Sequence, residues 1–200
     1  AYVVFEDLSL DQFGNRIPQF SFEVLRPTQS TGGTVPADLA EAIQGVALMP
    51  GSGEYALAST PVYYDEGQGR TRAANMHTQS GEADMPTAID ALRDELPNCG
   101  STSLIVSWFG DDLRCGDCTL TPRVEGTSAD GQGMPWSVSG IARPDAAIVP
   151  YKDDRPAYGG TPSDNSVIEA IATLNTSGHD VMFYPFILMT PVSYTHLTLP

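Results

Sequence analysis

The chain contains two kinds of apolar pattern, and the change between them predicts its organisation. Residues 2–8 (YVVFEDL) and 19–25 (QFSFEVL) indicate two strands, because their apolar positions suit a strand that is half-buried. Residues 27–36 (PTQSTGGTVP) then have the composition of a linker. We therefore expect residues 1–30 to end a β-rich domain and residues 31–38 to connect it to a second domain.

Three nearly continuous apolar runs follow the linker. They are GVALM (45–49), STSLIVSWF (101–109) and VMFYPFILM (181–189). Short runs of this kind are typical of strands that are buried on both faces. We read each run as a buried strand, with Pro185 at a position that needs no ladder hydrogen bond.

Two segments between these runs carry apolar residues at helical spacing. Residues 85–97 (MPTAIDALRDELP) predict one helix, with Asp84 available as its cap. A second helix is expected to open at TPSD, where Thr161 would be the cap and Pro162 would occupy the first turn. Gly178 is expected to end it, since glycine readily adopts the conformation that stops a helix.

Strands that alternate with helices predict an α/β fold with a parallel sheet and helical crossovers. Two connections, 60–84 and 110–160, are long, and each follows a strand and precedes a helix. Both therefore lie beyond the carboxyl ends of strands, where parallel α/β folds place their ligand sites.

The charge of the chain restricts its partners. Ten Lys and Arg residues against 25 Asp and Glu residues give a formal net charge of −15, and Lys152 is the only lysine. Such a surface repels phosphate backbones, so we expect no direct nucleic-acid binding. No run approaches the roughly 18 apolar residues of a transmembrane helix, so we expect no membrane-spanning segment.

Five segments of the chain carry a recognisable pattern. They are YVVFEDLSLDQFGNRIPQFSFEVLRP, MPGSGEYALAST, SWFGDDLRCGDC, YGGTPSDNSVIEAI and FYPFILM. In order and spacing they resemble the large baseplate tail-tip protein of gene transfer agents and related siphophages, a megatron-like protein. The resemblance covers about residues 1–191.

The resemblance implies a fragment in which residues 1–30 end a phage-tail hub-like domain. Residues 39–191 would form the N-terminal part of a (β/α)8 TIM-like barrel related to glycoside hydrolases. The protein would be made in the bacterial cytoplasm and assembled at the tail tip of a virion or gene-transfer-agent particle. Its partners would be other tail and baseplate proteins and a host-envelope glycan, and threefold tail tips make a homotrimer the expectation.

The resemblance leaves two functions open and supplies no catalytic residues by itself. The barrel would degrade host glycans as a glycoside hydrolase, or it would be a structural or receptor-binding module without activity. Residues 192–200 (VSYTHLTLP) do not continue the family pattern, and we interpret them as a non-native scar.

Carboxylates at the ends of two predicted strands are the candidate catalytic groups. Glycoside hydrolysis needs two carboxyl groups about 5–10 Å apart. Asp111 and Asp112 follow the second strand, and at most one of them faces a sugar because adjacent extended residues point to opposite sides. Glu54 follows the first strand in the turn PGSGEY, and we pair it with one aspartate. Alternatively, the aspartates cap a turn or pair with Arg114, and Glu54 is simply exposed.

Aromatic and sulfur side chains complete the candidates. Trp108, Trp136 and Tyr184 are candidates for stacking on sugar rings, although core packing is an equal alternative for Trp108. Cys115 and Cys118 have the spacing of metal ligands, but no second CxxC completes a zinc site. Free thiols, a loop disulfide and a metal site stay open for these cysteines. We expect no cofactor and assign no metal-binding residue.

Overall fold

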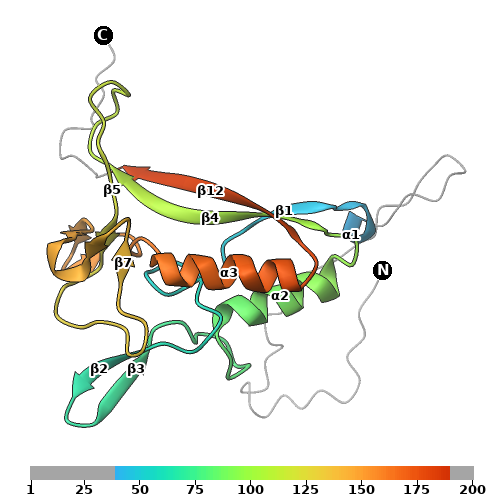
Figure 1. The fold of residues 1–200 in the computed structure, drawn as a ribbon, viewed down its shortest axis with the longest axis horizontal. Coiled ribbons are helices and arrows are strands. Elements are labelled where there is room, and N and C mark those ends of the chain that lie inside the picture. Colours follow the sequence, from blue (N-terminus) through green and yellow to red (C-terminus); the bar gives the residue numbers. More distant parts are fainter. Residues whose placement is uncertain (1–38, 190–200) are drawn as a thin grey trace, which may run out of the picture. The chain divides into compact units, whose positions relative to one another are not determined.

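A computed structural model describes residues 39–189 of the chain (Figure 1). The contacts divide the chain into two units, Ala1–Asp38 and Leu39–Pro200. The predicted end of a β-rich domain, its linker and the segment 192–200 lie outside the described residues.

A parallel sheet of three strands organises the described residues. Its order is β1 (Gly45–Leu48), β4 (Ser101–Gly110) and β12 (Asp180–Met189), with β4 in the centre. Both neighbours pair with β4 in parallel, and a short strand β5 (Leu120–Thr121) adds antiparallel to its carboxyl end. The three strands expected from the apolar runs are thus confirmed within one or two residues.

Two helices cover one face of this sheet (Figure 1). They are α2 (Asp84–Glu95) and α3 (Asp164–Thr176), and a short helix α1 (Leu39–Ala42) precedes β1. Alternate residues of β4, among them Leu104 and Val106, pack against Ile89 of α2 and Leu174 of α3. A strand between two others and under two helices buries its alternate side chains, which explains the buried pattern of β4.

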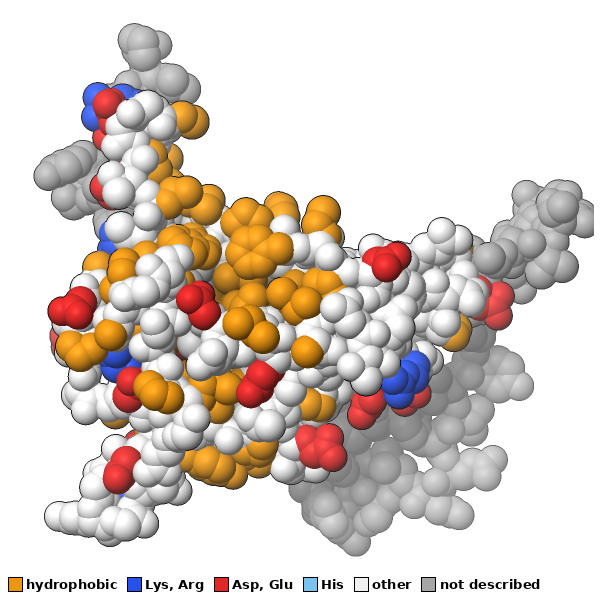
Figure 2. Space-filling model, in the orientation of Figure 1, with side chains coloured by type: hydrophobic (Ala, Val, Ile, Leu, Met, Phe, Trp, Pro, Cys, Tyr) orange, Lys and Arg blue, Asp and Glu red, His pale blue; other side chains and the backbone are white. Residues whose placement is uncertain are grey.

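The predicted burial is wrong for the third strand within the described structure, and β1 has no fully buried residue either. Met182, Phe183, Tyr184, Phe186 and Ile187 of β12 are all exposed by between 38% and 55%. β12 is an edge strand, and both of its faces are partly open. Phe183 and Ile187 lie on the same sheet face as Leu104, which packs under the helices, whereas the other three lie on the opposite face. Figure 2 shows hydrophobic side chains gathered along this part of the molecule. The apolar run therefore predicted the strand correctly but not its surroundings.

The two helix caps also differ from the expectation. Asp84 is the first residue of α2, and the preceding Ala83 makes no side-chain cap. The cap of α3 is Ser163, two residues after the expected Thr161, and its hydroxyl accepts a hydrogen bond from the Ser166 amide. Gly178 follows α3 with φ of +87°, as a helix stop requires. The Asp84 carboxylate and the Thr161 hydroxyl, which the sequence predicted as caps, accept hydrogen bonds from other segments instead.

Replacing Ser163 with alanine should lower the free energy of unfolding by about 0.5–2 kcal/mol, because the Ser166 amide loses its acceptor. Urea unfolding followed by far-UV circular dichroism would measure the change. Thr176→Ala is the matched control, since its hydroxyl only bonds an exposed helical carbonyl, that of Ala172. Equal effects of the two substitutions would contradict the assigned cap.

The two long connections fold into small paired strands rather than open loops. The first contains the hairpin β2 (Tyr63–Gly67) and β3 (Arg70–Ala73). The second contains a 3-10 turn η2 (Arg143–Asp145) and three pairs of short strands. The pairs are β6 (Arg123–Val124) with β9 (Ala147–Ile148), β7 (Ser137–Val138) with β8 (Ile141–Ala142), and β10 (Tyr151–Lys152) with β11 (Arg155–Pro156).

These connections share a second hydrophobic core, built around Tyr55, Val124 and Trp136. Trp108 of β4 packs against this core and also against the core under the helices. The two long connections are therefore fixed to the carboxyl half of the sheet. The described fold is mixed α/β with an open sheet over residues 39–189, and the (β/α)8 barrel stays a prediction.

Candidate functional site

Asp111 and Asp112 lie in the turn after β4, and both carboxylates serve that turn. Asp111 accepts a hydrogen bond from the Thr119 amide at 2.7 Å. Asp112 accepts bonds from the amide and the guanidinium of Arg114, at 2.7 to 3.0 Å. These bonds from Arg114 lower the pKa of Asp112 to about 2. This arrangement matches the turn-capping alternative.

Glu54 lies in a different network from the two aspartates, and its side chain is fully buried. One carboxylate oxygen accepts from the amide of Glu125 at 2.6 Å. The other accepts from the Tyr64 hydroxyl at 2.9 Å and from the Arg143 guanidinium at 2.5 Å. None of these contacts, within the described residues, involves Asp111 or Asp112. Because both oxygens are occupied, Glu54 supports its neighbours rather than a ligand directly.

Arg143 is the centre of this network, because its guanidinium joins the turn of Glu54 to two points of the second long connection. It bonds Glu54, the Asp130 carboxylate at 2.9 Å and the Gly126 carbonyl at 2.7 Å. Burial opposes its charge, but the bond to Glu54 and the charge of Glu54 outweigh burial and raise the pKa of Arg143. Arg143 therefore stays charged in the interior and is neutralised by two carboxylates.

Asp130 connects this network to the second core. It accepts a bond from the Tyr55 hydroxyl at 2.5 Å and from the Trp136 amide at 3.0 Å. Desolvation acts to raise the pKa of Asp130, but these bonds and the one from Arg143 lower it overall. Asp130 is thus an ionised acceptor that holds the segment before β7 in place.

Glu125 is a carboxyl whose surroundings favour its protonated form. Desolvation and the negative charge of nearby Glu54 raise the pKa of Glu125, while a bond from the Gly160 amide opposes that rise. Glu125 lines a mainly polar cavity of about 230 Å³, together with Tyr64, Arg72 and Arg143. A carboxyl with a raised pKa that lines a polar cavity is a candidate general acid.

Two glycines allow the connections to cross closely. A Cβ on Gly159 would lie 2.4 Å from the Gly53 nitrogen. A Cβ on Gly160 would lie 2.6 Å from the Glu54 Cγ. The strand-to-helix segment before α3 therefore packs directly on the turn that carries Glu54. The motif YGGTP is required for this contact and not only for entry into the helix.

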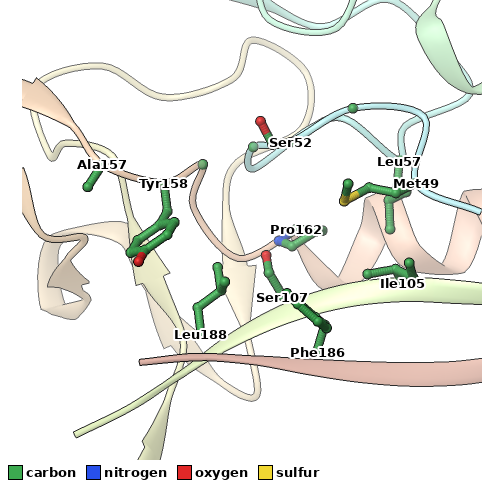
Figure 3. A pocket seen from close by; sticks show the side chains of 13 residues that line it. Met49, Ser52, Leu57, Ile105, Ser107, Ala157, Tyr158, Pro162, Phe186 and Leu188 are labelled. Carbon is green, nitrogen blue, oxygen red and sulfur yellow. The ribbon is translucent and has the colours of Figure 1, made fainter. Parts of the chain in front are cut away.

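A second cavity, of about 270 Å³ and mainly apolar, lies beside this crossing (Figure 3). It is lined from β4 by Ile105 and Ser107 and from β12 by Phe186 and Leu188. Tyr158 contributes an aromatic ring to the cavity, and the centroid of this ring lies 6.2 Å from that of the Phe109 ring. The cavity thus lies on the sheet face opposite the helices, towards the carboxyl ends of the strands.

The three aromatic residues predicted from sequence have separate positions. Trp136 is buried, and its indole donates to the Thr161 carbonyl at 2.8 Å. Trp108 packs between the two cores, which is the core-packing alternative. Tyr184 is 43% exposed on β12, but it does not line the apolar cavity that Tyr158 lines.

The three cysteines are free thiols in this structure, and Cys115 is exposed. Over residues 39–189, no group of three or more His, Cys, Asp or Glu side chains is placed to hold a metal ion. The described part of the chain also contains no helix with the length and apolar character needed to cross a membrane.

The sequence pointed to Glu54 but not to Glu125, Arg143 and Tyr158, which line the two cavities. Tyr158 was detectable, because it precedes two glycines at the end of a long connection. Glu125 and Arg143 carried no such signal, since each lies among polar residues without a periodic pattern. A scan of the chain against protein-family models finds no matching family. No curated protein is significantly similar to the chain.

Proposed function

We propose that residues 39–189 belong to a glycoside-hydrolase-like barrel of a tail-tip baseplate protein, and that its carboxyl edge binds a host-envelope glycan. The main support for this proposal is that both long connections lie at the carboxyl edge of the parallel sheet. Consecutive parallel strands, helices on one face and elaborated loops at the carboxyl edge are the arrangement from which such barrels are built.

The two cavities supply different parts of the proposed glycan site. Tyr158 and the apolar lining suit the apolar face of a sugar ring. Arg72 and Glu125 in the neighbouring polar cavity suit hydroxyl groups. The two cavities are neighbours along two segments of the chain. Gly53 and Tyr158 line the apolar cavity, while Glu54 and Pro156 line the polar one. A chain of sugars that occupies both cavities would therefore cross these segments.

Glycan binding is testable by co-sedimentation of the protein with insoluble peptidoglycan. Tyr158→Ala should weaken binding about tenfold, which corresponds to roughly 1.4 kcal/mol of lost stacking. Tyr63→Ala is the control, because Tyr63 is a partly exposed tyrosine that lines neither cavity. Equal binding by both variants would count against the proposed site.

Hydrolysis is the further part of this proposal, and it depends on Glu125. A protonated Glu125 would act as the general acid, and burial together with the charge of Glu54 would hold its pKa high. Activity should fall as pH rises through that raised pKa, because the proton is then lost. Glu125→Gln should remove release of reducing sugars and leave binding intact. If the unaltered protein binds glycan and releases no sugar, the receptor-binding alternative is favoured.

A further inference from the structure

The turn after β1, the loop before α2 and the start of α2 bring a serine, a histidine and an aspartate to one cavity. This cavity has a volume of about 280 Å³, and Ser52, His77 and Asp84 all line it. Ser52 and His77 are 25 residues apart in sequence, and His77 and Asp84 are 7 apart, so the three do not form a short sequence motif. We infer that they form a nucleophilic site for carboxylic esters.

The histidine and the aspartate are tightly paired. His77 Nδ1 lies 2.7 Å from the Asp84 Oδ2, and the His77 amide donates to the other carboxylate oxygen at 2.9 Å. The Asp84 side chain is only 5% exposed, whereas that of His77 is 67% exposed. A carboxylate that binds Nδ1–H leaves Nε2 as the proton acceptor, which is the arrangement that a general base needs.

Ser52 supplies an accessible hydroxyl to the cavity that this pair lines. It is exposed in the turn Gly51-Ser52-Gly53, where Gly53 has φ of +126°. A Cβ on the neighbouring Gly51 would lie 4.0 Å from the Asp84 Oδ2, so the turn packs against the pair. In Figure 3 the Ser52 hydroxyl points away from Ser107 and the apolar cavity below it.

The position of the turn indicates the class of substrate. Gly51 and Ser52 line both this cavity and the apolar cavity of about 270 Å³. An ester with a short apolar acyl group could therefore place its carbonyl at Ser52 and its acyl chain against apolar side chains. This chemistry differs from glycoside hydrolysis and does not depend on glycan binding.

The reaction follows from these roles. Ser52 Oγ bonds to the carbonyl carbon while its proton passes to His77 Nε2. The ester C–O bond then breaks, and the leaving alcohol takes that proton, which gives an acyl-serine and a free alcohol. Water next attacks the acyl-serine, one proton passes through His77 to Ser52 Oγ, and a carboxylic acid is released. Asp84 is a positioning residue because it acts through His77.

The test uses p-nitrophenyl butyrate hydrolysis and labelling by a fluorophosphonate probe in the 200-residue chain. We expect hydrolysis above the rate in buffer, and labelling located at Ser52 by mass spectrometry. Ser52→Ala should abolish labelling and reduce hydrolysis at least 100-fold, and His77→Gln should reduce both similarly. Ser101→Ala, at the amino end of β4, is the matched control and should leave both unchanged.

The role of Asp84 has its own readout. Asp84→Asn should lower kcat and leave KM nearly unchanged, which a general loss of the site would not do. Far-UV circular dichroism would verify that each variant keeps its fold, and Ser52→Ala changes only an exposed side chain. Absence of hydrolysis above the buffer rate, or probe labelling that persists in Ser52→Ala, would overturn the inference. Neither outcome bears on glycan binding by Tyr158.

Discussion

Replacing Arg143 with methionine should lower the free energy of unfolding by about 3–5 kcal/mol, the largest effect expected from any single change in the described residues. Methionine keeps much of the apolar stem, so the loss comes from the charge. Glu54, whose side chain is fully buried, would keep a carboxylate without its guanidinium partner. Asp130 would lose one of its donors in the same substitution.

Urea unfolding followed by tryptophan fluorescence would measure this change, since the Trp136 amide donates to Asp130 in the same network. Arg93→Met is the matched control. Arg93 is 60% exposed and lies 3.7 Å from Asp90, so its pair should contribute at most about 1 kcal/mol. The double substitution Glu54→Gln and Arg143→Met should recover part of the loss. A similar cost for Arg143→Met and Arg93→Met would refute the assigned network.

Replacing Gly159 with alanine should cost about 1–3 kcal/mol and disrupt the apolar cavity. The new Cβ would meet the Gly53 nitrogen at 2.4 Å and the Ser52 carbonyl carbon at 2.7 Å. Both are backbone atoms, so no side-chain rotation relieves the contact. The two segments would have to separate, and Tyr158 would move away from the cavity that it lines.

Gly116→Ala is the control for this prediction, because a Cβ there has no heavy atom within 4 Å. Thermal or urea unfolding would measure stability, and peptidoglycan co-sedimentation would measure the effect on the proposed site. We expect Gly159→Ala to lose both stability and binding, and Gly116→Ala to keep both. If Gly159→Ala unfolds at the same urea concentration as Gly116→Ala, the close crossing is not as described.

The two substitutions together address how the proposed site is supported. Arg143 holds the connecting segments by charge, while Gly159 allows them to approach by lacking a side chain. Arg143 lines the polar cavity and Gly159 lines the apolar one, so both residues also border the proposed site. A stability loss without loss of binding would separate the framework from the glycan site.

The sequence determined the positions of the main elements. Periodicity predicted the strands β1, β4 and β12 and the helices α2 and α3, because a buried strand or an amphipathic helix leaves a local pattern. The order of these elements also predicted that both long connections lie at the carboxyl edge. Those features depend on neighbours in the chain, which a sequence displays directly.

Only the tertiary structure decided which polar side chains meet. Glu54 was expected beside Asp111 or Asp112, but it binds Arg143, which lies 89 positions away. Burial of β12 also could not be predicted from its apolar run, because exposure depends on what covers an edge strand. Hydrophobic patterns recur at short spacing, whereas ion pairs and hydrogen bonds depend on where distant segments cross. That is why the sequence predicted the framework, while the network around Arg143 emerged only from the folded chain.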